Sequence, residues 1–158
     1  MRNKAKFLTY GAVIAALYAV LSHLQNMLLP GSASAMIQVR VAEAISVLAF
    51  FTPAAIPGLA VGCFLFNLTS GMALPLDMVV GTAATLMATA GMYGLRRWPA
   101  VGFLLPAVCN GLLVGWELSV YIGGGFLMNA AYVALGEIIA LALGIPLYFA
   151  LKKSPLWR

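Results

Sequence analysis

The chain has 158 residues, of which 63% are hydrophobic and only 8% are charged, and its mean hydropathy is +1.01. These values lie far outside the range of soluble globular domains and predict an integral membrane protein. The net charge of +5 does not indicate a nucleic-acid-binding protein, because the basic residues form short clusters at the ends of apolar stretches and no single recognition surface.

Six apolar stretches follow one another along the chain, separated by turn-forming and basic residues. A helix needs about 20 apolar residues to cross the hydrocarbon core, so the length suits roughly six spans and leaves none for a soluble catalytic domain. We therefore predict an all-α fold, a bundle of six transmembrane helices in a single integral membrane domain over residues 1–158. The predicted helices cover about 7–29, 36–51, 53–70, 76–95, 99–121 and 127–151.

The basic residues test this number of helices, because cytoplasmic loops of membrane proteins carry an excess of lysine and arginine. With six spans and cytoplasmic termini, eight of the nine basic residues lie on the cytoplasmic side, and only Arg40 lies outside. Five or seven spans would place the C-terminal basic cluster outside. We therefore expect a multi-pass protein of the cell (plasma) membrane. The cytoplasmic basic residues are Arg2, Lys4, Lys6, Arg96, Arg97, Lys152, Lys153 and Arg158.

The only four carboxylates of the chain, Glu43, Asp77, Glu117 and Glu137, all lie within or at the edge of apolar stretches. An ionisable group in a membrane span is costly and is a functional candidate by default. On the six-helix topology the first three lie in the outer half of the membrane, and Glu137 approaches its middle. We therefore predict that the carboxylates converge on an outward-facing pocket.

Amide and aromatic side chains extend this predicted pocket. Asn110 and Glu117 are two helical turns apart and share one face of a helix. Trp116 and Tyr121 near the mouth offer stacking surfaces, so a planar, polar heterocycle would suit the pocket. The predicted binding residues are Glu43, Asn67, Asp77, Asn110, Trp116, Glu117, Tyr121, Asn129 and Glu137.

Most of these residues also have a structural interpretation. Arg40 and Glu43, three residues apart on one predicted helix, can neutralise each other. Asp77 can cap the start of its helix, and the two aromatic side chains can belong to the aromatic belt at the membrane surface. Glu137 is the hardest to explain in this way, because no basic residue is expected at its depth.

Small residues repeat at four-residue intervals in the first predicted helix, as Ala12 with Ala16 and Ala15 with Ala19. Such residues flatten one side of a helix, so that a second backbone can approach closely. We interpret these four alanines as a docking face for a partner. The alternative is ordinary packing within the bundle.

Motifs of enzymes are absent from the sequence. No phosphate-binding G-x-x-x-x-G-K loop and no G-x-S-x-G motif occur, and the single histidine and two isolated cysteines match no zinc-hydrolase pattern. We therefore expect no enzymatic activity, no metal and no cofactor. No inverted repeat with paired broken helices is evident either, which argues against a self-sufficient secondary transporter. A binding pocket without an energy source of its own implies a partner.

Segments along nearly the whole chain resemble one known family. They are QVRVAEA at 38–44, TPAAIPGLAVGC at 52–63 with Asn67, LDMVVGTAATL at 76–86, Pro106 with Asn110, Gly136 with Glu137, and GIPL at 144–147. They resemble the substrate-binding S components of energy-coupling factor (ECF) transporters and, more narrowly, the queuosine-precursor transporter family. This resemblance implies a six-helix membrane protein that captures a 7-deazaguanine such as preQ0, preQ1 or queuine from outside the cell.

The resemblance also implies partners. A transmembrane coupling protein would dock onto the alanine motif, here Ala12 and Ala16, and two cytoplasmic ATPases would consume ATP. A guanine-like edge carries a ring N–H beside an amine, and a carboxylate such as Glu117 or Glu137 can accept both hydrogen bonds. Glu43 or Asp77 would accept an exocyclic amine. The alternatives are an S component for another vitamin, such as riboflavin or thiamine, and a small membrane channel or assembly factor.

Overall fold

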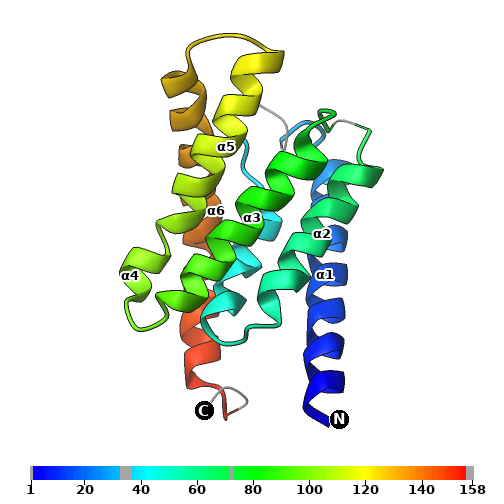
Figure 1. The fold of residues 1–158 in the computed structure, drawn as a ribbon, viewed down its shortest axis with the longest axis vertical. Coiled ribbons are helices and arrows are strands. Elements are labelled where there is room, and N and C mark those ends of the chain that lie inside the picture. The colour runs from blue at the N-terminus through cyan, green and yellow to red at the C-terminus, as the bar shows by residue number, and fades with distance from the viewer. Residues whose placement is uncertain (1, 33–36, 72, 156–158) are drawn as a thin grey trace.

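The structure, a computed structural model, describes residues 2–32, 37–71 and 73–155, and all of its regular elements are helices. Figure 1 shows that the helices alternate in direction along the longest axis when the 3₁₀ helix at 41–50 is counted and the four-residue helix at 99–102 is left out, and that both termini lie at the same end. The predicted all-α class is confirmed. The helices are α1 (Arg2–Leu28), the 3₁₀ helix η1 (Val41–Phe50), α2 (Ala55–Thr69), α3 (Asp77–Gly94), α4 (Pro99–Gly102), α5 (Leu105–Tyr121) and α6 (Phe126–Lys153).

Three stretches are long and apolar enough to cross a membrane: Asn3–Leu28, Pro99–Tyr121 and Phe126–Lys153. The second of these is interrupted, because α4 ends and α5 begins again after residues 103–104. Pro106 in the first turn of α5 explains the break, since it lacks the N–H that would continue the helix and its ring crowds the preceding turn. The sequence prediction of one continuous helix over 99–121 is therefore corrected.

The second predicted helix is also corrected. The expected α-helix at 36–51 is a 3₁₀ helix that begins only at Val41, and the expected start at residue 36 lies outside the described residues. The side chain of Gln25 explains the late start. Its Nε2 donates to the carbonyl oxygen of Val39 at 2.5 Å, and its Oε1 accepts from the Val41 N–H at 2.7 Å. These bonds hold the chain before η1 extended and use groups that a helix would need.

Glycines at four-residue spacing bring neighbouring helices into close contact. Gly58 and Gly62 of α2 face α1, and a Cβ on Gly62 would lie 2.6 Å from the Cβ of Tyr18. A Cβ on Gly115 of α5 would likewise lie 2.6 Å from the Cα of Ala130 in α6. Real Cβ atoms do not approach this closely, so only glycine permits these contacts. Packing of this kind holds helices together where hydrophobic burial cannot drive association.

The last helix packs against η1 in the same way. A Cβ on Gly144 would lie 2.6 Å from the Ala44 carbonyl oxygen, and one on Gly136 would overlap the backbone of Gln38. Ala140, between the two glycines, is fully buried. This stripe of small residues on α6 seats η1 and the extended segment before it in the middle of the bundle.

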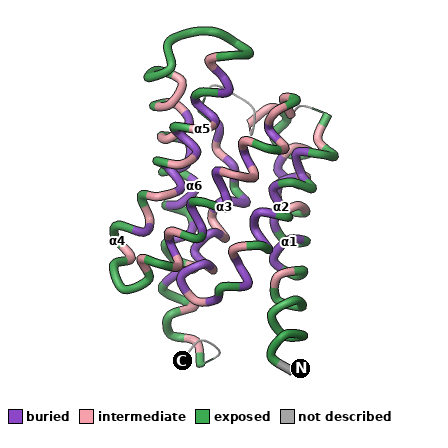
Figure 2. Tube along the Cα trace, in the orientation of Figure 1, coloured by how far each residue is buried: buried purple, intermediate pink, exposed green. Residues whose placement is uncertain are grey.

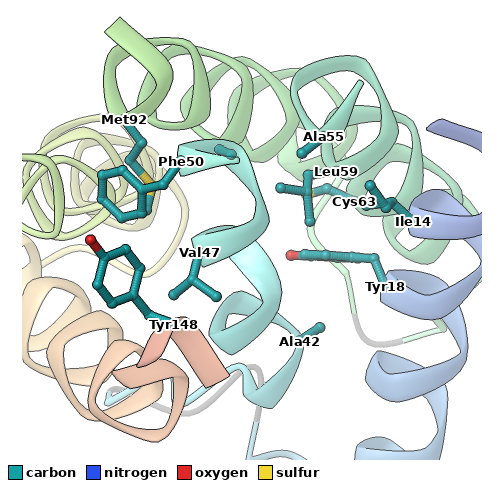
Figure 3. Packing of buried hydrophobic residues seen from close by; sticks show 11 residues of the cluster. Ile14, Tyr18, Ala42, Val47, Phe50, Ala55, Leu59, Cys63, Met92 and Tyr148 are labelled. Atoms are coloured by element: carbon teal, nitrogen blue, oxygen red, sulfur yellow. The ribbon is translucent and has the colours of Figure 1, made fainter. Parts of the chain in front are cut away.

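The apolar core surrounds η1. Figure 3 shows Phe50 and Tyr148 beside Met92 on one side of η1, and Tyr18 with Leu59 on the other. The rings of Phe50 and Tyr148 are 5.5 Å apart and pack edge to face near the end that carries both termini. Figure 2 shows buried residues on the inward faces of the helices and exposed residues on their outward faces.

Candidate substrate-binding site

The ends of α2 and α5 and the start of α3 lie opposite the termini (Figure 1), and Asn67, Glu117 and Asp77 are buried polar residues of these three segments. All four carboxylates are buried, with exposed fractions of 2% for Glu43, 7% for Asp77, 0% for Glu117 and 3% for Glu137. Arg40 is equally buried at 7% and precedes η1. Four separate helices thus contribute one acid each to a region that holds a single guanidinium.

Glu43 is satisfied by the protein itself. The hydroxyl of Tyr18 donates to its Oε1 at 2.5 Å, and Ser46 Oγ donates to its Oε2 at 2.8 Å. The predicted pairing of Arg40 with Glu43 is therefore not observed, since Arg40 Nη2 instead donates to Gln38 Oε1 at 3.3 Å. The i, i+3 rule behind that prediction needs both residues on one helix, whereas Arg40 lies before η1 in extended backbone.

The sequence analysis missed Tyr18. It is fully buried in α1, and Figure 3 shows its hydroxyl pointing toward η1. Its signal was present, because Ser22 and Gln25 follow it at helical spacing and are buried on the same face. The first helix is otherwise mostly apolar. A polar stripe on such a helix marks the side that packs against the rest of the bundle.

A Tyr18→Phe variant is expected to be less stable by about 1–3 kcal/mol, because the buried Glu43 carboxylate loses its donor while the ring still fills its space. Thermal unfolding of the purified protein in detergent measures this. Tyr148→Phe is the matched control, since Tyr148 is a buried tyrosine that packs on Phe50 on the opposite side of η1 from Tyr18. Equal unfolding temperatures for the two variants would contradict the assignment.

Asp77 and Asn67 connect the start of α3 to the end of α2. Asp77 Oδ2 accepts from the backbone N–H of Leu74 at 2.7 Å, and the Asp77 carbonyl accepts from Asn67 Nδ2 at 2.8 Å. The carboxylate thus bonds to the turn before the helix, which modifies the predicted capping role. Asn67 Oδ1 is buried and has no hydrogen-bond partner among the described residues.

Several buried atoms beside this connection have no partner. Within the described part of the chain, neither oxygen of Glu117 accepts a hydrogen bond, nor does Glu137 Oε2, and Asn110 Nδ2 donates none. The Glu117 carboxyl lies close enough to the Asp77 carboxyl to share a hydrogen bond with it when one of the two is protonated, and Arg40 is within electrostatic range. An unsatisfied buried polar group costs about 1–3 kcal/mol, and more when it is charged. Native proteins rarely keep such groups without a functional reason.

Glu137 has a basic neighbour after all. The expectation that no basic residue reaches its depth is wrong, because Arg40 and Glu137 lie within electrostatic range of each other. The backbone of residue 38 passes directly over Gly136, which brings the extended segment and Arg40 beside α6. Arg40 was assigned to the membrane surface from sequence only because its segment was expected to be helical.

The structure does not bring Trp116, Tyr121 or Asn129 into this cluster. Trp116 is 51% exposed and Tyr121 is 44% exposed, as side chains of an aromatic belt would be. Asn129 Nδ2 donates to Ser119 Oγ at 3.1 Å and to the Gly123 carbonyl at 3.0 Å. Asn129 therefore ties together the connection between α5 and α6.

The four alanines of α1 divide between two roles. Ala15 is buried against Gly62 of α2, and Ala19 is half-buried, which is packing within the bundle. Ala12 and Ala16 are exposed on the outer surface. Ala12 also borders an apolar groove of about 280 Å³ between α1 and α2.

Comparison with protein families identifies the family to which the chain belongs. A family model described as QueT transporter matches residues 8–153 of the chain. The chain belongs to the QueT transporter family. Comparison with curated proteins and with solved structures finds no match. The resemblance seen in the sequence is thus confirmed at the level of the family.

Membership in the QueT family makes this chain a transporter and not an enzyme. A transporter implies a small-molecule substrate, and the three long apolar helices agree with a protein that resides in a membrane. No group of three or more histidine, cysteine, aspartate or glutamate side chains within the described ranges could hold a metal ion.

Proposed function

We propose that this QueT family member is the substrate-capture S subunit of an ECF importer, and that it binds a 7-deazaguanine precursor of queuosine from outside the cell. The observation that carries the proposal is that Glu117, Glu137 and Asn110 are all buried and all carry polar atoms without a hydrogen-bond partner among the described residues. Family membership supports transport, and the partnerless acceptors support a ligand rich in N–H donors.

The hydrogen-bonding pattern narrows the roles of the acids. Glu43 already accepts from Tyr18 and Ser46, so it supports the site and does not read the ligand. Glu117 and Glu137 remain, and either can accept the ring N–H and exocyclic amine of a guanine-like edge in charge-assisted hydrogen bonds. Asn110 and the free oxygen of Asn67 complete the polar lining.

Titration of the purified protein with the nitrile, aminomethyl and queuine forms of the deazaguanine tests this function. We expect saturable binding of at least one form, and mass spectrometry of ligand released from the purified protein should identify the same compound. Riboflavin and thiamine serve as controls because both are alternative vitamin substrates. Binding of either vitamin, with no binding of any deazaguanine, would overturn the proposal.

We also propose six membrane passes within a single domain over residues 1–158 of a plasma-membrane protein, with both termini in the cytoplasm. The alternating helix directions and the common end of the two termini support this topology (Figure 1). The basic pairs at 96–97 and 152–153 lie at that same end. The 3₁₀ helix and α2 are shorter than the candidate spans. α1, α3 and α6 pack around η1, whereas α2 packs between α1 and α3 and keeps an exposed apolar face that would meet lipid.

Labelling of single cysteines in a chain that lacks Cys63 and Cys109 tests this topology. A membrane-impermeant thiol reagent added to intact cells is expected to label Gly125→Cys, between α5 and α6, and to leave Lys153→Cys unlabelled until the cells are opened. A Cβ at Gly125 meets no atom within 4 Å, so that substitution disturbs nothing. Labelling of Lys153→Cys from outside would contradict the six-pass arrangement.

The exposed alanines of α1 are the proposed contact with the coupling protein. Leucine at Ala12 or Ala16 is expected to abolish co-purification of the coupling protein and ATPases, because the added side chain keeps the two backbones apart. Ligand binding should persist, since neither residue contacts the polar cluster. Val20→Leu, at another exposed position of α1, is the control. Intact complexes with both alanine variants would reject this docking face.

A further inference from the structure

Arg40 has hydrogen-bond donors without an acceptor among the residues that the structure describes. The guanidinium is 7% exposed, and its one hydrogen bond, to Gln38 Oε1, is long at 3.3 Å. Its Nε is buried without a partner among the described residues. Glu43 is not that partner in the structure, where Tyr18 and Ser46 donate to its two oxygens and Arg40 donates to neither. A guanidinium carries five N–H donors, so most of the donor capacity of Arg40 remains open.

The unused donors of Arg40 lie beside α3. A Cβ built on Gly81 would lie 3.7 Å from Arg40 Nη1 and 3.1 Å from Asn67 Nδ2, so the guanidinium and the amide meet over the glycine. Glu117 on α5 and Glu137 on α6 are both within electrostatic range of Arg40. The cluster therefore places one strong donor within electrostatic range of two buried carboxylates, and each of the three groups comes from a different element.

A molecule that satisfies both kinds of group carries an acceptor next to its donors. The lactam of a guanine-type ring has this arrangement, with a carbonyl oxygen adjacent to a ring N–H and an amine. We infer that Arg40 donates to the lactam carbonyl oxygen of the substrate while Glu117 or Glu137 accepts from the neighbouring N–H groups. This assignment rests on the proposed function, and it makes Arg40 a specificity-determining residue for an oxo group at that ring position.

The test compares the aminomethyl 7-deazaguanine with its thione analogue, which keeps both N–H donors but replaces the carbonyl oxygen by sulfur, a weaker acceptor. Calorimetric titration of the unchanged protein is expected to show at least about tenfold tighter binding of the oxo compound. In Arg40→Gln, affinity for the oxo compound should fall by about 10- to 100-fold, as expected for a hydrogen bond to a charged group. Affinity for the thione should change little, so the preference disappears.

Arg40→Lys should restore part of the preference, because it keeps a charged donor, and Lys152→Gln is the control for loss of a positive charge elsewhere. Equal loss for both compounds in Arg40→Gln would overturn the inference. So would equal affinities in the unchanged protein, a measurement that does not depend on the folding of any variant. Binding of neither compound would instead reject the proposed function, which keeps the two failures distinct.

Discussion

A Gly136→Val variant is expected to lose at least about 3 kcal/mol of stability, together with most of its ligand binding. Even the first carbon of the new side chain would overlap the carbonyl group of Gln38. These are backbone atoms that cannot rotate away, so the cost lies at or above the upper end of ordinary overpacking. The extended segment must move away from α6, and Arg40 moves with it.

Thermal unfolding followed by circular dichroism measures the loss of stability, and ligand titration measures the loss of binding. Gly136→Ala should show the same effects to a smaller extent. Gly94→Ala is the matched control, because a Cβ at the exposed end of α3 meets no atom within 4 Å. If Gly136→Val unfolds at the temperature of the Gly94 control, the close contact between α6 and residue 38 is not present.

Glu117→Gln and Glu137→Gln are expected to weaken ligand binding by about 10- to 100-fold without lowering stability. Each change removes a charged acceptor, whose hydrogen bonds contribute about 1.5–3 kcal/mol. In the absence of ligand, the neutral amide avoids the cost of a buried carboxylate without a partner. A variant that binds ligand more weakly than the unchanged protein, but is equally or more stable, identifies an acid that binds the ligand and does not support the fold.

Glu43→Gln provides the contrast in the same experiment. Its carboxylate accepts from Tyr18 and Ser46, so the substitution should lower the unfolding temperature. Calorimetric titration and thermal unfolding of all three variants complete the comparison. Unchanged affinity in both Glu117→Gln and Glu137→Gln would remove the carboxylates from substrate recognition.

The features that could be predicted from sequence depend on composition and local spacing. Apolar stretches between turn residues indicated the order of the helices. The scarcity of acidic residues in an apolar chain made those residues candidates for a functional site. Asn110 and Glu117 were expected to share a face of one helix, and the structure buries both, each with an unpartnered atom. Helical periodicity suffices to predict that two residues share a face, because both residues lie on the same helix.

The features that could not be predicted depend on contacts between distant parts of the chain. Gln25 holds residues 39 and 41 from another helix, and this long-range contact converts an expected α-helix into an extended segment and a 3₁₀ helix. Trp116 was expected to line the pocket because it lies near the mouth, yet it is exposed beside the buried Glu117, since neighbouring residues on a helix point about 100° apart. The break before Pro106 is an exception among the incorrect predictions. It could have been predicted from the sequence, since proline removes a helical hydrogen bond.

The tight winding of η1 has a mechanical consequence. A 3₁₀ helix turns by about 120° and rises about 2.0 Å per residue, whereas an α-helix turns by about 100° and rises about 1.5 Å. Relaxing η1 to the wider form would therefore rotate Phe50 by about 140° relative to Glu43 and draw them about 3.5 Å closer. Either Tyr18 or Tyr148 would then lose its contact. The 3₁₀ helix η1 must therefore move as a rigid unit, so a displacement at Glu43 also displaces Phe50 at its other end.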